Sequence, residues 1–196
     1  MRCSFIVNYS YLFTAYTKTV ITDSLGRGVQ QFLPASIKLQ YIPGLKLATV
    51  LKKYCRDQLD FQYDIIFILL GSNDSVNSGK GHIYELWRSV ISGVRFLAPK
   101  GVKILVSTFL PRLDLGNSLY ATPVELNCTQ GFWSFLVKAC NYTKATPVDL
   151  RLHFIEGKFP ALELFVHDGI HLSTAGRRRL ANVLNMHLHR FQTQLP

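Results

Sequence analysis

The chain has 196 residues, of which 48% are hydrophobic and 17% are charged. This length and composition fit one domain around a single core and exclude extended disorder. The longest apolar run, residues 65–70, is far shorter than the roughly 18 residues that a membrane-spanning helix requires. Lysine and arginine outnumber aspartate and glutamate by 22 to 12, a net charge of +10, which favours either a polyanionic partner or simple solubility.

The domain organisation follows from the same numbers. Residues 1–17 are interpreted as an N-terminal extension, and residues 18–196 as one domain. A signal peptide is poorly supported because Asn8, Tyr9 and Ser10 interrupt the apolar start of the chain. The four cysteines show no C-x-x-C spacing and are expected to be ordinary reduced thiols, so we expect an intracellular, cytoplasmic protein rather than a secreted one.

Hydrophobic periodicity predicts strands that alternate with helices along the chain. The predicted strands are residues 18–22, 37–41, 63–70, 102–108 and 150–155, and the predicted helices are residues 29–33, 45–56, 84–97, 132–142 and 174–191. Residues 111–127 and 157–170 are predicted to be loops, the second with a short turn of helix. Alternation of this kind indicates an α/β domain with a five-stranded parallel sheet and right-handed crossovers.

Reactive side chains follow three of the predicted strands. Asp168 precedes His171 by three residues in a loop, so that the carboxylate can hold the imidazole in one tautomer and leave its other nitrogen free to take a proton. Ser24 follows the first strand, and Asn73 follows the third. Each has an ordinary alternative, because Ser24 could be a helix N-cap and Asn73 a turn residue.

A backbone donor is also available after the second strand. Gly44 has no side chain to keep a ligand from its N–H, although taken alone it is a turn glycine. Loops at the carboxyl ends of parallel strands share one edge of the sheet, where sites are expected. We therefore consider these residues together.

Their order along the chain resembles the SGNH hydrolases, the lipase and esterase superfamily also called GDSL-like. Residues 22–25, Thr-Asp-Ser-Leu, stand in place of the first block, Gly-Asp-Ser, and Gly44 matches the glycine of the second. Residues 71–74, Gly-Ser-Asn-Asp, match the third block, Gly-x-Asn-Asp, and residues 168–171, Asp-Gly-Ile-His, match the last, Asp-x-x-His. The departure is Thr22, where the family has glycine, which either crowds the turn that presents Ser24 or extends the strand by one residue.

The resemblance implies a three-layer α/β/α sandwich of the flavodoxin-like type and a serine esterase that needs no cofactor or metal. Ser24 would be the nucleophile, His171 the base and Asp168 the residue that orients His171. The oxyanion hole would be formed by the N–H groups of Ser24 and Gly44 and the side chain of Asn73. The substrate would be a small acyl ester, such as an acetyl ester, or a lipid ester.

A narrower resemblance concerns the esterase domains inside the first open-reading-frame proteins of some non-LTR retrotransposons. Asp-Ser in the first block, the short chain, Asp-Gly-x-His and the basic balance are all similar to that subgroup. It implies a domain that works beside nucleic acid or membranes.

Two alternatives are weighed against the esterase, and one cluster of basic residues is interpreted separately. The fold could serve a catalytically weak or inactive basic module that binds nucleic acid or an anionic membrane. His167 and His171 could hold zinc together with Asp168, although no further ligand is clustered with them. Residues 177–179, three successive arginines of the last helix, cannot all face one way and are interpreted as solvated surface rather than as a phosphate contact.

Overall fold

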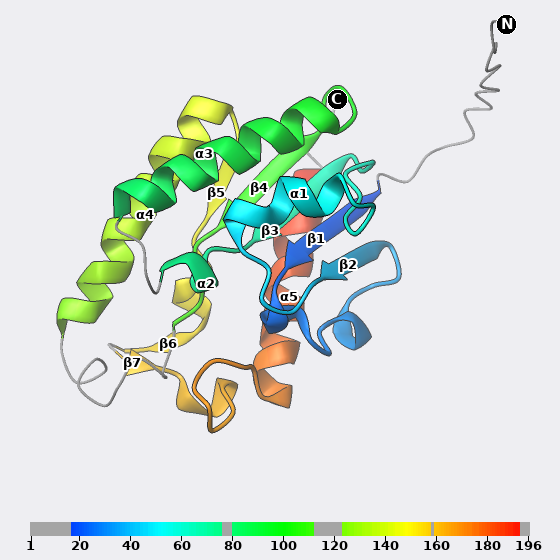
Figure 1. Ribbon diagram of the computed structural model, residues 1–196. Helices are drawn as coiled ribbons and strands as arrows, with labels where there is room; N and C mark the ends of the chain where they lie inside the picture. The colour runs from blue at the N-terminus through cyan, green and yellow to red at the C-terminus, as the bar shows by residue number, and fades with distance from the viewer. Residues whose placement is uncertain (1–16, 76–79, 112–122, 158, 193–196) are drawn as a thin grey trace, which may run out of the picture.

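The fold is described from a computed structural model, which places residues 17–75, 80–111, 123–157 and 159–192 (Figure 1). The interpretation of residues 1–16 as an extension lies outside these described residues. Within them, no helix is both long enough and apolar enough to cross a membrane.

The centre of the molecule is a five-stranded parallel sheet in the order β2-β1-β3-β4-β5. Its strands are β1 (Lys18–Thr22), β2 (Ile37–Tyr41), β3 (Ile65–Leu69), β4 (Lys103–Ser107) and β5 (Thr146–Val148). A separate antiparallel pair, β6 (Ile155–Glu156) and β7 (Phe159–Pro160), lies beyond the sheet. The predicted parallel sheet of five strands is confirmed.

Helices cover both faces of the sheet, as Figure 1 shows. The longer helices are α1 (Val50–Tyr54), α3 (Lys80–Leu97), α4 (Pro123–Thr143) and α5 (Thr174–Gln192), and α2 (Ser72–Ser75) is a single turn. Short 3-10 turns are η1 (Ser24–Gly26), η2 (Gln30–Phe32), η3 (Leu47–Thr49), η4 (Arg151–His153) and η5 (Leu162–Leu164). The three-layer sandwich is therefore also confirmed.

The alternation of side chains along the central strands divides the core in two. On β3, Ile65, Phe67 and Leu69 face the layer of α5, whereas Ile66 and Ile68 face the layer of α1, α3 and α4. All five side chains are almost completely buried, as expected for a parallel strand covered on both faces. This burial accounts for the continuous apolar run in the sequence.

The strand order places a topological switch at β1 and β3. The chain leaves β1 toward β2 on one side, and β3 lies on the other side of β1. Ligands of open α/β sheets bind outside the carboxyl ends of the strands at such a point. The segments that follow β1 and β3, which carry Ser24 and Asn73, therefore start at this crevice.

The prediction of a strand at residues 150–155 is wrong. The fifth strand is Thr146–Val148 at the edge of the sheet. Pro147 has no backbone N–H, and an edge strand tolerates this because one of its sides pairs with no other strand. Leu150 and Phe154 are both buried but are four residues apart, and a 3-10 turn brings them to the same side. Asp149 fixes that turn by accepting hydrogen bonds from the backbone N–H of Arg151 (3.2 Å) and from its guanidinium Nε (2.8 Å).

Other boundaries differ less. Residues 123–127, predicted to be loop, form the first turns of α4. The helix predicted over residues 45–56 is a 3-10 turn followed by the five residues of α1. The short helical turn predicted within residues 157–170 is confirmed as η5. The last predicted helix, residues 174–191, is confirmed as α5.

Candidate active site

The loop that carries Asp168 and His171 is fixed at both ends. Phe165 and Leu172 form an isolated antiparallel bridge, and the N–H of Val166 donates to the carbonyl of His171 at 2.9 Å. Gly176, in the first turn of α5, permits the helix to approach this loop, since a Cβ there would lie 2.0 Å from the carbonyl oxygen of Leu164. The sequence between Phe165 and α5 is thus held as a tight turn.

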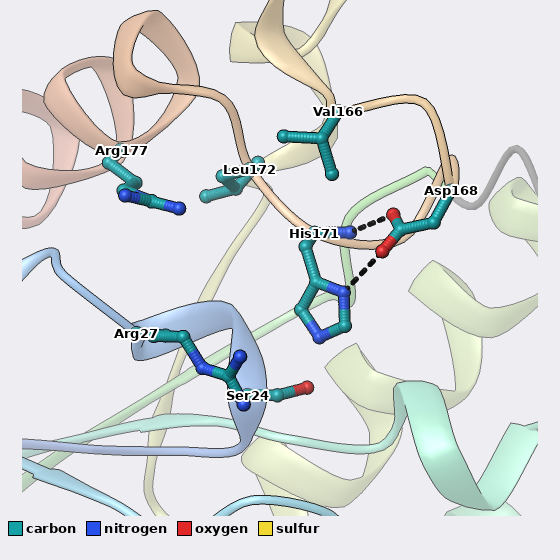
Figure 2. A pocket seen from close by; sticks show the side chains of 7 residues that line it. All are labelled: Ser24, Arg27, Val166, Asp168, His171, Leu172 and Arg177. Carbon is teal, nitrogen blue, oxygen red and sulfur yellow. Dashed lines mark hydrogen bonds and ion pairs between the residues drawn. The ribbon is translucent and has the colours of Figure 1, made fainter.

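Within this turn Asp168 and His171 lie side by side. Oδ2 of Asp168 and Nδ1 of His171 are 2.6 Å apart, and Oδ1 accepts from the backbone N–H groups of Ile170 (2.8 Å) and His171 (2.9 Å) (Figure 2). A carboxylate in this position accepts a hydrogen bond from Nδ1–H, which leaves Nε2 as the free acceptor of the ring. The side chains are 36% and 33% exposed, so the pair is open to the pocket.

Asp168 is held in its charged form. Partial burial alone would raise the pKa of its carboxyl, but the hydrogen bonds from the His171 ring and from the N–H groups of His171 and Ile170 outweigh this effect. The pKa of Asp168 therefore lies well below its usual range. An ionised carboxylate beside the ring would favour a positive charge on that ring.

Ser24 is presented by the N-terminus of η1. Asp23 is the N-cap: its Oδ1 accepts from the N–H of Leu25 at 3.0 Å, and its carbonyl accepts from Gly26 at 3.0 Å. Among the described residues, no acceptor bonds to the backbone N–H of Ser24 itself. The serine thus places a half-buried side chain and a free N–H at the carboxyl end of β1.

Asn73 connects the segments that follow β1 and β2. Its Nδ2 donates to Oδ2 of Asp23 at 2.9 Å and to the carbonyl of Leu45 at 3.3 Å. Gly44 precedes Leu45 in a turn closed by the bond from Leu45 N–H to the carbonyl of Ile42 (3.0 Å). The φ of +68° at Gly44 and the proline before it are typical of a type II turn.

These bonds settle where the predicted oxyanion residues lie. Asn73 contacts Asp23, which precedes Ser24, and Gly44 precedes Leu45, whose carbonyl accepts from the same amide, but neither Asn73 nor Gly44 is among the residues that line the pocket. Both hydrogens of the Asn73 amide are engaged in the resting structure. The longer of its two bonds, to Leu45, is the one that an oxyanion would most easily replace.

The pocket itself has a volume of about 190 Å³. It is lined by Ser24, Arg27, Val166, Asp168, His171, Leu172 and Arg177. Figure 2 shows the Ser24 hydroxyl directed toward the side on which the His171 ring lies, and Asp168 beyond that ring. No hydrogen bond joins Ser24 to His171 in the described structure.

Thr22, in the position of the family's glycine, is the last residue of β1. It is completely buried, and its backbone continues the parallel ladder opposite Tyr41 and Leu69. Its methyl group lies against Gly26, where a Cβ would be 2.3 Å from Thr22 Cγ2. Thr22 therefore extends the strand, and the absence of a side chain at position 26 gives it room.

Four of the residues that line the pocket are not among the site residues predicted from the sequence: the apolar Val166 and Leu172 and the charged Arg27 and Arg177. The prediction of solvated surface for residues 177–179 includes Arg177, which lines the pocket. The interpretation of Arg177 is corrected: it is half-buried, whereas Arg178 lies over the Phe32 ring and Arg179 donates to the His153 carbonyl. The sequence feature that could have indicated a pocket position for Arg177 is its place in the first turn of the helix after His171.

The zinc alternative finds no ligand set in this structure. Among the described residues, no three histidine, cysteine, aspartate or glutamate side chains are grouped closely enough to hold a metal ion. His167 is exposed and does not line the pocket.

The fold is shared with several solved structures. A protein from Streptococcus pneumonia, assigned as a platelet activating factor, superposes with a TM-score of 0.71 at 20% identity over 91% of this chain and 86% of that one. A protein from Bacteroides fragilis assigned as an acylhydrolase gives 0.69 at 16% identity, covering 90% and 88%. A GDSL-like lipase from Bacteroides thetaiotaomicron gives 0.65 at 12% identity, covering 89% and 88%.

Sequence comparison adds no relative. No protein-family model matches this chain, and no curated protein sequence is similar to it. At identities of 12% to 20% the structural likeness establishes the fold, that of the GDSL-like hydrolases.

Proposed function

We propose that the protein is a serine esterase of the SGNH type that hydrolyses a carboxylic ester through an acyl-enzyme. The observation that carries the proposal is the 2.6 Å bond between Asp168 and His171 in a pocket that Ser24 also lines. The fold shared with GDSL-like lipases and acylhydrolases supports it.

The first half of the reaction forms the acyl-enzyme. Ser24 Oγ attacks the ester carbonyl carbon while Nε2 of His171 takes the hydroxyl proton, and Asp168 stabilises the resulting imidazolium. The tetrahedral oxyanion accepts hydrogen bonds from the N–H groups of Ser24 and Gly44 and from the Asn73 amide. When the oxyanion collapses, the bond to the alcohol oxygen breaks and His171 returns its proton to that oxygen.

The second half releases the acid. Water enters the position that the alcohol has left and gives a proton to His171 as its oxygen bonds to the acyl carbon. Collapse of the second tetrahedral intermediate frees the carboxylic acid, and Ser24 Oγ recovers its proton from His171. Each oxyanion donor is expected to contribute roughly a hundred- to a thousand-fold in rate.

The size of the pocket favours a small acyl group. Its volume of about 190 Å³ is below the roughly 300–1,000 Å³ of pockets that take drug-sized ligands. Val166 and Leu172 supply its apolar wall. An acetyl or similarly short acyl chain fits these dimensions better than a long lipid chain.

The direct test is hydrolysis of p-nitrophenyl acetate together with labelling by a fluorophosphonate probe. The wild type is expected to hydrolyse the ester and to carry the label on Ser24, whereas Ser24→Ala and His171→Ala abolish both. His167→Ala is the matched control, because His167 is exposed on the same loop and lies outside the pocket. Equal background rates in the wild type and in both site variants would overturn the esterase proposal.

The net charge of +10 supports the second candidate, a basic module that binds an anionic membrane or nucleic acid. Retention on anionic liposomes and on single-stranded nucleic acid, measured across a range of salt concentrations, tests it. Electrostatic binding weakens steeply with salt. Binding that does not change with salt would contradict this candidate.

A further inference from the structure

Two arginines converge on the wall of the pocket that faces His171. Arg27 follows Ser24 by three residues, and its N–H donates to the Ser24 carbonyl at 3.1 Å. Arg177 reaches the same wall from α5, as Figure 2 shows. Segments far apart along the chain thus bring two positive charges to the pocket that the candidate nucleophile also lines.

The contact between the two segments is close. Gly28, with a φ of +74°, lies directly beneath the Arg177 side chain: a Cβ there would lie 3.2 Å from Nη1 and 3.5 Å from Cζ. Any residue with a side chain at position 28 would push the Arg177 guanidinium away from the turn. The packing therefore fixes Arg177 beside the residue that follows Arg27.

Neither guanidinium has a partner in the part of the chain that the structure describes. Arg27 and Arg177 form no side-chain hydrogen bond or ion pair there. Asp168, the sole carboxylate among the described residues that line the pocket, is already engaged by His171 and Ile170.

Several other arginines of the described residues have side-chain partners. Arg151 binds Asp149 at 2.5 Å, Arg95 donates to the carbonyls of Thr143, Val102 and Lys144, and Arg178 lies 5.3 Å above the ring of Phe32. Arg27 and Arg177 differ from these three in lining the pocket, where no acceptor among the described residues engages their donors. Free guanidinium donors in a concave site match the paired oxygens of a carboxylate or a phosphate.

We propose that the substrate is an ester that also carries an oxyanionic group, carboxylate or phosphate, and that Arg27 and Arg177 bind this group while the ester lies at Ser24. The proposal rests on the proposed esterase function and names its substrate class. A pocket of about 190 Å³ keeps the anion within a few bonds of the ester carbonyl. The arginines act as specificity residues, since they bind a part of the substrate that does not react.

The experiment compares esters of matched reactivity that differ in charge. The neutral reference is phenyl acetate, with 3-acetoxybenzoate and 3-acetoxyphenyl phosphate carrying the anion on the alcohol side and phenyl hemisuccinate carrying it on the acyl side. Acid release in a pH-stat gives kcat/KM for each ester, corrected for its uncatalysed rate. We expect the kcat/KM of at least one anionic ester to exceed that of phenyl acetate by tenfold or more. The preferred ester then shows whether the anion lies on the alcohol side or the acyl side of the substrate, and whether it is a carboxylate or a phosphate.

The variants are Arg27→Gln and Arg177→Gln, with Arg177→Lys to retain charge without the planar pair of donors. Each Gln variant is expected to lower the ratio of anionic to neutral kcat/KM by about tenfold, through KM, as for the loss of one charge-assisted contact. Arg177→Lys should lower it less. Arg178→Gln is the matched control on the same helix and should leave the ratio unchanged, because its guanidinium lies over Phe32.

Two results would overturn the proposal: no preference for any anionic ester in the wild type, or a preference that survives in both Gln variants. If the wild type hydrolyses no ester, the esterase chemistry fails, and inorganic phosphate then tests the arginine pair separately. A rise in Tm with phosphate that both Gln variants lose and Arg178→Gln keeps would preserve the anion site. No rise in the wild type would remove the anion site as well.

Discussion

The Cγ2 methyl group of Thr22 occupies the space that a side chain at Gly26 would need. A Cβ at position 26 would lie 2.3 Å from this methyl group and 3.0 Å from Cβ of Tyr41, and both neighbours belong to strands that cannot shift easily. The residue in the family's glycine position and the small residue four places later are therefore coupled.

Gly26→Ala is expected to destabilise the fold by about 1–3 kcal/mol, the usual cost of overpacking. In the background of Thr22→Gly the same change should cost much less, because the obstructing methyl group is gone. Urea unfolding of the wild type, the two single variants and the double variant measures the coupling energy between positions 22 and 26. Equal costs in the two backgrounds would contradict the steric account.

A matched control for that cycle is Gly81→Ala. Gly81 is exposed in the first turn of α3, and a Cβ there meets nothing within 4 Å. Alanine at this helical position is expected to be neutral or to stabilise by up to roughly 1 kcal/mol. A destabilisation similar to that of Gly26→Ala would show that loss of glycine, rather than contact with Thr22, is responsible.

Asn73 is predicted to serve both stability and activity. Asn73→Ala removes the donor 2.9 Å from Oδ2 of the buried Asp23, and we expect a loss of about 1–3 kcal/mol of unfolding free energy. It also removes the oxyanion donor that we propose, and we expect this loss to lower kcat by roughly a hundred- to a thousand-fold. Thermal unfolding and ester hydrolysis on the same preparation measure the two effects.

Asn73→Asp tests the structural role of the amide through the pH dependence of stability. The change would set a second carboxylate against Asp23, so the protein should become less stable as the pH rises and both groups ionise. Ser24→Ala is the comparison, since it should abolish activity with little change in stability. If Asn73→Ala lowers stability alone, the amide has only a structural role.

Asp168→Asn is expected to lower kcat by roughly a thousand- to ten-thousand-fold while the fold is preserved. The N–H groups of Ile170 and His171 both donate to Oδ1, so the amide oxygen of asparagine would take that position. Its NH₂ group would then face Nδ1 of His171 and force the ring proton onto Nε2, where it blocks transfer from Ser24. Steady-state kinetics with p-nitrophenyl acetate check this, and an unchanged kcat would contradict the proposed role of Asp168 in orienting His171.

His187 is predicted to make stability depend on pH. Burial lowers its pKa in the folded protein, and the charges of His153 and Arg190 act in the same direction. At pH values below the ordinary histidine pKa of 6.5, His187 binds a proton more readily in the unfolded chain than in the folded protein. The residue therefore lowers the free energy of unfolding as the pH falls, and it has no effect well above pH 6.5. Urea unfolding between pH 7.5 and 5 measures the slope.

The variant that tests this dependence is His187→Leu, which replaces a ring whose Nε2 is buried and has no hydrogen-bond partner among the described residues. It should flatten the pH dependence over this range. His189→Leu, at an exposed position of the same helix, should not. An unchanged slope in His187→Leu would assign the dependence to another group.

The sequence alone determined the features that are local. A carboxylate three residues before a histidine in a turn places Asp168 against His171, because the backbone between them closes hydrogen bonds to the same carboxylate. Continuous apolar runs and helical periodicity likewise predict β3 and α5, since burial on both faces or on one face leaves a fixed spacing of apolar residues. The order of the strands and helices followed from the same patterns.

Only the tertiary structure decided which distant segments meet. The pairing of Asn73 with Asp23, the contact of Thr22 with Gly26 and the convergence of Arg27 with Arg177 depend on strand order and on the approach of α5 to the turn after η1. A linear pattern records which side of its own element a residue occupies. It does not record which residue of another element lies opposite, because that is set by the packing of complete layers.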